Sequence, residues 1–271
     1  MKILTGKEQK NVKNQFKTVL KQEQKFLAYQ PNELIAEKMC KIEKNLQQKI
    51  PEKVTTSLQQ VFAKSFQLLF EKGSNLIYKT YRTSKIQHTQ QLHQKLERFF
   101  SKKELFYLQK EVTSCGLFHQ GVTAIEGAGL GLLGIGLPDI PIFLAMVLRN
   151  IYQIGQIYGF QIDNNAEKYM VLSIICTAVT TKAQRERFSA LTDRVAYQVS
   201  LSKSDIDDMK LQQMIETTSQ KICTRLLFAK AVQGMPIIGV TGGVVNFAMM
   251  NDIRKAATYK YQKRFLSQYL S

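Results

Sequence analysis

Glycine and proline are almost absent from the first 115 residues of this chain, where only Gly6, Pro31, Pro51 and Gly73 occur. Helix-breaking residues are therefore rare over that whole stretch. No segment alternates convincingly between polar and apolar residues, and the sequence contains no Asn-Gly or Asp-Gly hairpin turn. These absences argue against a β-sheet protein and predict an all-α fold, a multi-helix bundle.

Paired cysteines and the common catalytic motifs are missing as well. Cys40, Cys115, Cys176 and Cys223 are far apart and form no CxxC pair, which is typical of reduced thiols in a cytosolic protein. The chain has no GxxxxGK[ST] phosphate loop, no HExxH and no GxSxG. We therefore expect no cofactor and no bound metal, and the sequence favours a protein that is not an enzyme.

An apolar leader is lacking at the N-terminus. The opening residues, MKILTGKEQKNVKNQFK, do not contain the apolar stretch of about 7–15 residues that a signal peptide requires. We expect the protein to remain in the cytosol.

Acidic residues are few, and the chain carries a formal net charge of +17. Residues 1–110 hold 22 lysines and arginines against 9 acidic residues, so most of the excess lies there. A basic field of this size favours an anionic partner, which could be a membrane surface, a nucleic acid or an acidic protein. No nucleic-acid-reading motif accompanies the charge, which makes nucleic acid the weaker alternative.

Regularly spaced lysines mark the first predicted helix. Val12, Phe16, Val19, Leu20, Phe26 and Leu27 form its apolar side. A helix with these two faces suits an anionic membrane surface, and it equally suits an ordinary bundle helix with one solvated face. The basic positions recur every three or four residues, at Lys10, Lys13, Lys17, Lys21 and Lys25.

Two glycine- and proline-containing segments are almost free of charge. Residues 127–148 contain only Asp139, and residues 231–251 contain no charged residue. Each is long enough to span a bilayer, but Asp139 and the prolines at 138, 141 and 236 are costly in lipid. We favour two hairpin segments packed centrally in the bundle, where close helix approach would use Gly127, Gly131, Gly239 and Gly243.

A helix beginning at Asp139 explains the features that are awkward in a membrane span. Pro138 and Pro141 would lie at its first turn, Asp139 would lie at the positive end of its dipole, and Gly159 would end it. We expect Asn246, in the second segment, to fix how the two segments pack through its hydrogen bonds. The packing stripe of the first helix comprises Ile140, Leu144, Val147, Ile151, Ile154 and Tyr158.

One alternative assigns chemistry to the first hairpin. His119 and Glu126 are seven residues apart and would share a helix face, close to Asp139. Together they could form a metal or acid–base site for a metal-assisted hydrolase. The plainer interpretation is that His119 starts a helix and that Glu126, in an apolar interior, pairs with Arg149 or another base.

Two motifs resemble the EcsC protein family. GLPDIPIFLAMVLRNIYQIGQIYGF (136–160) is similar to its DIP…I…I…YG core, and MPIIGVTGGVVNFAMMNDIRKAATYKYQKRFL (235–266) is similar to its C-terminal PxxG…GG…N…A…Y…RFL signature. The resemblance implies an α-helical bacterial protein of unassigned biochemistry whose namesake is encoded beside an ABC transporter. It supplies no catalytic residue.

We therefore predict a basic amphipathic helical extension over residues 1–100 and an EcsC-like helical domain over 101–271. The favoured role is that of a non-enzymatic accessory protein, peripheral to the inner face of the cytoplasmic membrane. Its basic helices and Gly-Pro segments would bind anionic lipid or a transporter-associated membrane protein. The hydrolase and the nucleic-acid binder remain as alternatives.

Overall fold

The fold is helical throughout the part of the chain that the structure describes. The computed structural model describes residues 4–29, 52–79, 103, 105–110, 112, 139–233 and 242–270. Within these ranges every regular element is a helix and no strand occurs, which confirms the predicted all-α class. The longer helices are α1 (Gly6–Ala28), α3 (Glu52–Lys79), α6 (Asp139–Ile157), α7 (Asn165–Val179), α8 (Lys182–Ser200), α9 (Asp208–Gln233) and α10 (Gly242–Ser267).

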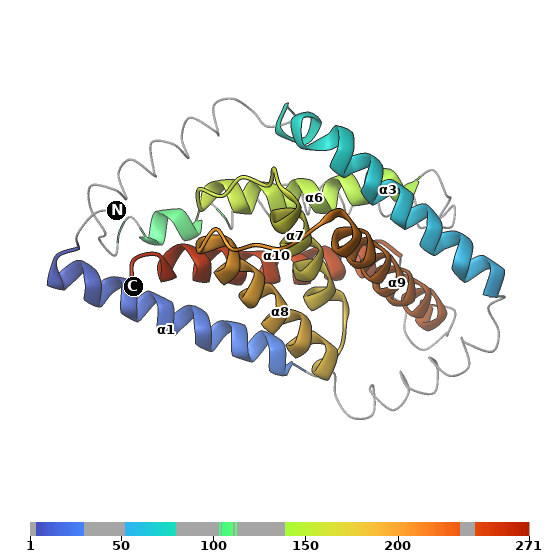
Figure 1. Cartoon of the computed structure of the whole chain (residues 1–271). Coiled ribbons are helices and arrows are strands. Elements are labelled where there is room, and N and C mark those ends of the chain that lie inside the picture. Colours follow the sequence, from blue (N-terminus) through green and yellow to red (C-terminus); the bar gives the residue numbers. More distant parts are fainter. Residues whose placement is uncertain are drawn as a thin grey trace.

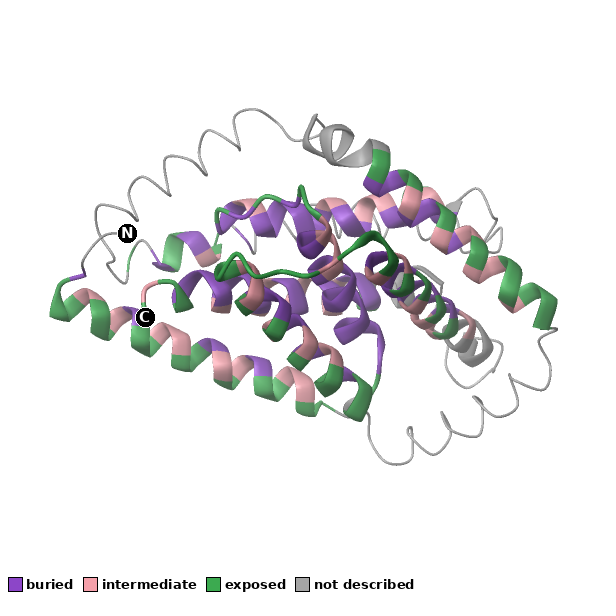
Figure 2. Ribbon diagram, viewed as in Figure 1, coloured by how far each residue is buried: buried purple, intermediate pink, exposed green. Residues whose placement is uncertain are grey.

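Helix α7 forms the centre of the bundle. It packs against α8, α9 and α10, and nearly all of its residues are buried (Figures 1 and 2). The Asn164 side chain accepts a hydrogen bond from the Glu167 backbone N–H and so caps the helix start. A helix buried on nearly every side needs no amphipathic stripe, and α7 carries no charged residue after Lys168.

Helix α6 begins at Asp139, with Pro141 in its first turn, as the sequence predicts. All six residues of the predicted packing stripe are buried, so the stripe is confirmed. Burial extends further round the helix, because Asn150 and Gln153, which lie off the stripe, are buried too. The helix packs between α3 and α10 and is therefore a core element of the bundle.

Gly159 ends α6, also as predicted. Its φ is +83°, in the left-handed region where a side chain is disfavoured. The Gly159 N–H donates to the Gln156 carbonyl and the Phe160 N–H donates to the Gly155 carbonyl, which together make a Schellman cap. The chain then turns toward the start of α7.

Two helices from the predicted extension pack on this core. Helix α1 lies along α10 and contacts α8, while α3 lies on the opposite side of the bundle against α6 and α9 (Figure 1). The boundary predicted at residue 100 lies outside the described residues, so the division into extension and domain stays a prediction. The glycine-rich stretch 127–136 and residues 235–241 are outside them too.

Candidate functional site

The outer side of α1 is a continuous lysine face, which we define as Lys10, Lys13, Lys17, Lys21 and Lys25. All five side chains are exposed. At 100° per residue they fall within an arc of about 120° on the helix. The described residues place no carboxylate within ion-pair distance of any of them.

Both acidic residues of α1 point away from the lysine face. Glu8 closes a capping box at the helix start, where its Oε2 accepts a hydrogen bond from the Thr5 backbone N–H at 2.8 Å. Glu23 follows Val12 and Val19 along the buried side and is itself buried. The exposed side of the helix therefore carries charge of one sign.

Glu23 anchors α1 through an ion cluster formed by Glu23, Asp193, Lys260 and Lys263, in which Glu23 and Lys260 are buried and the Asp193 side chain is 40% exposed. The Lys260 Nζ lies 2.6 Å from Glu23 Oε1 and 2.9 Å from Asp193 Oδ1. The Lys263 Nζ lies 2.6 Å from Glu23 Oε2 and 2.7 Å from Asp193 Oδ2. Two negative and two positive groups balance one another, so the cluster joins α1, α8 and α10 without leaving a net buried charge.

The cluster favours the ionised form of Glu23. Burial alone would raise the pKa of this carboxyl, but the attraction and hydrogen bonds of Lys260 and Lys263 outweigh that effect and lower its pKa below the ordinary value. The same balance raises the pKa of Lys263, because Glu23 and Asp193 more than offset its burial. The role of the ion cluster in this structure is to hold α1, α8 and α10 together.

Arg185 fastens the C-terminal end of α1. Its Nη1 donates to the Phe26 carbonyl at 3.1 Å, its Nε donates to the Thr180 carbonyl at 3.1 Å, and its guanidinium lies 5.0 Å from the centre of the Phe26 ring. With the ion cluster, this contact fixes the inner side of α1 at two places. The lysine face is thus held outward on a docked helix.

A second buried ion pair lies within the RFL motif of α10. Arg264 donates to both carboxylate oxygens of Glu167, at 2.7 and 2.9 Å, and its guanidinium lies 4.1 Å from the centre of the Phe160 ring. Both ionic side chains are buried. This arrangement ties α10 to the start of α7 and to the turn after α6.

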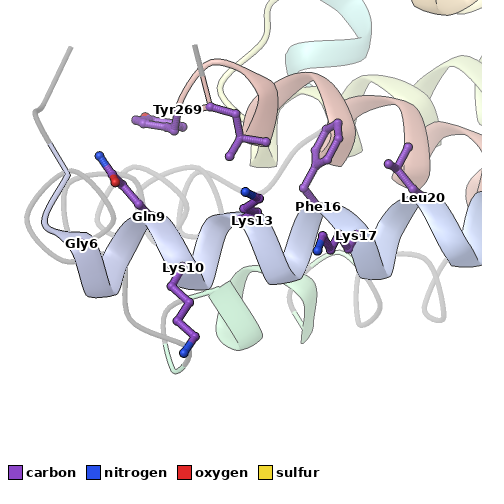
Figure 3. A pocket seen from close by; sticks show the side chains of 9 residues that line it. Gly6, Gln9, Lys10, Lys13, Phe16, Lys17, Leu20 and Tyr269 are labelled. Atoms are coloured by element: carbon purple, nitrogen blue, oxygen red, sulfur yellow. The ribbon is translucent and has the colours of Figure 1, made fainter.

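A groove runs beside the N-terminal half of α1. It has a volume of about 720 Å³ and lies between α1 and the turn that follows α10. Lys10, Lys13 and Lys17 line it together with Phe16 and Leu20. Figure 3 shows Gln9, Phe16 and Leu20 on the side of α1 that faces α10 and the turn after it, where Tyr269 lies.

The two buried cysteines offer no reactive thiol. Cys176 and Cys223 are free, and burial raises their pKa values to about 12 and about 11. Neither is a thiolate at neutral pH, so neither is an activated nucleophile. Cys40 and Cys115 lie outside the described residues.

Several candidate residues of the two glycine-rich segments and of the metal or acid–base site lie outside the described residues: His119, Glu126, Gly127, Gly131, Pro138 and Gly239. Asp139 is the first residue of α6, and Gly243 and Asn246 lie in the first turns of α10. Arg149 is half-buried on α6. Within the described part of the chain, no group of three or more His, Cys, Asp or Glu residues could hold a metal ion.

One helix among the described residues is long and apolar enough to cross a membrane. It is the segment Ile140–Ile157, with a mean hydropathy of 1.2, and 61% of it is buried inside the bundle. A buried core helix meets the same criteria, so length and composition are weak support for a span here.

The family of the chain follows from a comparison with known proteins. Residues 13–266 match the model of the EcsC protein family. The chain belongs to that family. Protein EcsC of Bacillus subtilis (strain 168) is 22% identical over 231 residues, which cover 84% of this chain and 86% of that protein. No solved structure matches. The match begins at Lys13 and includes most of α1, so four of the five lysines of the lysine face lie within it.

The buried ionic residues were not predicted from the sequence. Glu23 pairs with a lysine 240 positions later and Glu167 with an arginine 97 positions later, and no local pattern reveals such partners. One signal was present, because Glu23 continues the spacing of Val12 and Val19 on the apolar side of the helix. A carboxylate at a position of that kind needs a buried cation.

Proposed function

We propose that this EcsC-family protein is a non-enzymatic peripheral protein that binds anionic lipid at the inner face of the cytoplasmic membrane. The observation that carries the proposal is the lysine face of α1. Five exposed lysines share one side of a helix whose two carboxylates are engaged on other sides. Each lysine near an anionic bilayer contributes about 1 kcal/mol of attraction.

The way α1 is anchored supports this role. The ion cluster and Arg185 hold the inner side of the helix, so the lysines do not depend on folding at the membrane to become aligned. A preorganised cationic face loses little conformational entropy on binding. The described residues contain no observation that favours the hydrolase alternative, since His119 and Glu126 lie outside them.

The test compares two triple variants on lipid vesicles. Lys10, Lys17 and Lys21 are changed to Glu in one, and Lys53, Lys64 and Lys203, which are also exposed, are changed to Glu in the control. Each variant lowers the net charge from +17 by six, so overall charge is matched. Sedimentation with phosphatidylglycerol vesicles should show about 100-fold weaker partition for the α1 variant. The control, whose α3 positions lie across the bundle, should bind nearly as well as the unmodified protein (Figure 1).

Three results would overturn the proposal. Equal losses in both variants would show that total charge, and not the lysine face, determines binding. Binding to membranes from the host but not to lipid vesicles would point to a membrane protein as the partner. A larger effect of the α1 variant on DNA or RNA binding at low salt than on vesicle binding would favour nucleic acid.

A further inference from the structure

The groove beside α1 has two apolar walls. Phe16 and Leu20 supply an apolar wall from the helix, and Tyr269 and Leu270 supply another from the turn after α10. Consecutive backbone bonds from Tyr269 N–H to Leu266 and from Leu270 N–H to Ser267 hold that turn in place. The volume of the groove, about 720 Å³, is in the range of sites that bind small molecules.

Three lysines also line the groove. Lys13 and Lys17 follow one another along the helix beside Phe16, and Lys10 extends from the outer side of the helix (Figure 3). Neither Glu8 nor Glu23 lines the groove. The groove therefore combines ammonium groups with hydrocarbon surface.

We infer that the groove binds one molecule of an anionic membrane lipid, with its phosphate at Lys13 and Lys17 and one acyl chain against Phe16, Leu20 and Leu270. This inference rests on the proposed function and extends it from attraction to a surface to a site with a defined occupant. The lysines of the groove belong to the lysine face, so a lipid in the bilayer that meets α1 is already beside the opening.

The composition of the walls selects an amphiphile over a free anion. A free phosphate would use the lysines and leave the apolar walls in water, whereas a neutral chain would leave the ammonium groups without a partner. Burial of apolar surface contributes about 25 cal/mol for each Å², so both parts of an anionic lipid add to its affinity. An anionic lipid would therefore use both the lysines and the apolar walls of the groove.

The test uses soluble single-chain probes below their micelle concentration. Isothermal titration calorimetry compares myristoyl lysophosphatidylglycerol with the lysophosphatidylcholine of the same chain and with glycerol phosphate. We expect saturable binding of one lysophosphatidylglycerol per protein, clearly weaker binding of the phosphocholine probe, and no binding of glycerol phosphate. Equal affinity for the two lysolipids, or binding of glycerol phosphate, would overturn the inference.

Matched variants locate the site. Leu270 is 40% exposed, so Leu270→Glu leaves the core intact, and Leu201→Glu, at a leucine that is 46% exposed beyond α8, is its control. Leu270→Glu should weaken the binding of lysophosphatidylglycerol about tenfold or more, because a charge enters the apolar wall. Leu201→Glu should leave the affinity unchanged. Equal effects of the two changes would contradict the placement.

A second pair of variants distinguishes binding in the groove from binding to the lysine face as a whole. The Lys13→Gln, Lys17→Gln variant and the Lys21→Gln, Lys25→Gln variant remove the same charge from the same exposed side of α1. Both should weaken vesicle binding to a similar extent, but only the first should lose the soluble lysolipid. Vesicle binding without lysolipid binding would refute the groove and leave the proposed function standing. Lysolipid binding without vesicle binding would refute the proposed function instead.

Discussion

Glu23 has a double effect on the surface of α1. Its burial removes a negative charge from the exposed side of the helix, and its ion pairs with Lys260 and Lys263 hold that helix against α10. Two of the lysines of the chain are thus used as internal partners, while those of the lysine face remain exposed. A single carboxylate on the apolar side therefore separates the structural lysines from the candidate binding lysines.

We predict that Glu23→Gln destabilises the fold. The change leaves Lys260, which is 2% exposed, with only Asp193 as a charged partner, and breaking a buried pair of this kind costs about 3 kcal/mol. Chemical denaturation measures the free energy of unfolding. The control is Asp205→Asn, which removes the ion pair between Asp205 and Lys210. The Asp205 side chain is 88% exposed, so the effect of this change should be much smaller. Equal effects would contradict the structural role of the cluster.

The stability that Glu23 contributes should depend on pH, which a comparison of the unmodified protein with Glu23→Gln can measure. Because the pKa of Glu23 is lower in the folded protein, its stabilising effect is complete above the ordinary carboxyl value of 4.5 and is lost as the pH falls through the lowered pKa. The difference in unfolding free energy between the unmodified protein and Glu23→Gln should be constant from pH 6 to 8, which is about 1.5 units or more above that value. It should shrink below pH 4.5. A difference that stayed constant into strong acid would contradict the ion pairing.

At the scale of helices, α6 shows how much of a helix's bounds and burial the local sequence pattern predicts. The alternation of steps of four and three predicted its buried stripe from Ile140 to Tyr158, and the turn residues predicted both of its ends. The pattern did not predict that Asn150 and Gln153 would be buried as well. Their burial depends on α3 and α10, which are distant in sequence and cover the other sides of α6.

Gly159→Ala should lower stability by about 1 kcal/mol, because a Cβ is disfavoured at a φ of +83°. Gly6→Ala is the control, since Gly6 has no atom within 4 Å of an added Cβ and begins a helix. That change should not lower the stability. Thermal unfolding followed by circular dichroism distinguishes the two, and an unchanged melting temperature in Gly159→Ala would show that the cap tolerates a side chain.

At the scale of the whole molecule, composition and spacing predicted the class of fold and the lysine face. The +17 charge indicated an anionic partner, and the exposure of Lys10 to Lys25 is as the spacing requires. The groove could not be predicted, because its second wall comes from Tyr269 and Leu270 at the far end of the sequence. Sequence periodicity describes one helix at a time, whereas a groove depends on how two distant segments meet.

The most direct test of the central claim asks which helix touches the lipid. The chain contains no tryptophan, so a single introduced one reports on its own surroundings. Asn14 is exposed within the arc of the lysine face, and Gln60 is exposed on α3. On phosphatidylglycerol vesicles, the emission of Asn14→Trp should shift to shorter wavelength and that of Gln60→Trp should not. A shift at Gln60→Trp alone, or vesicle binding with no shift at Asn14→Trp, would contradict the claim that α1 is the membrane-binding helix.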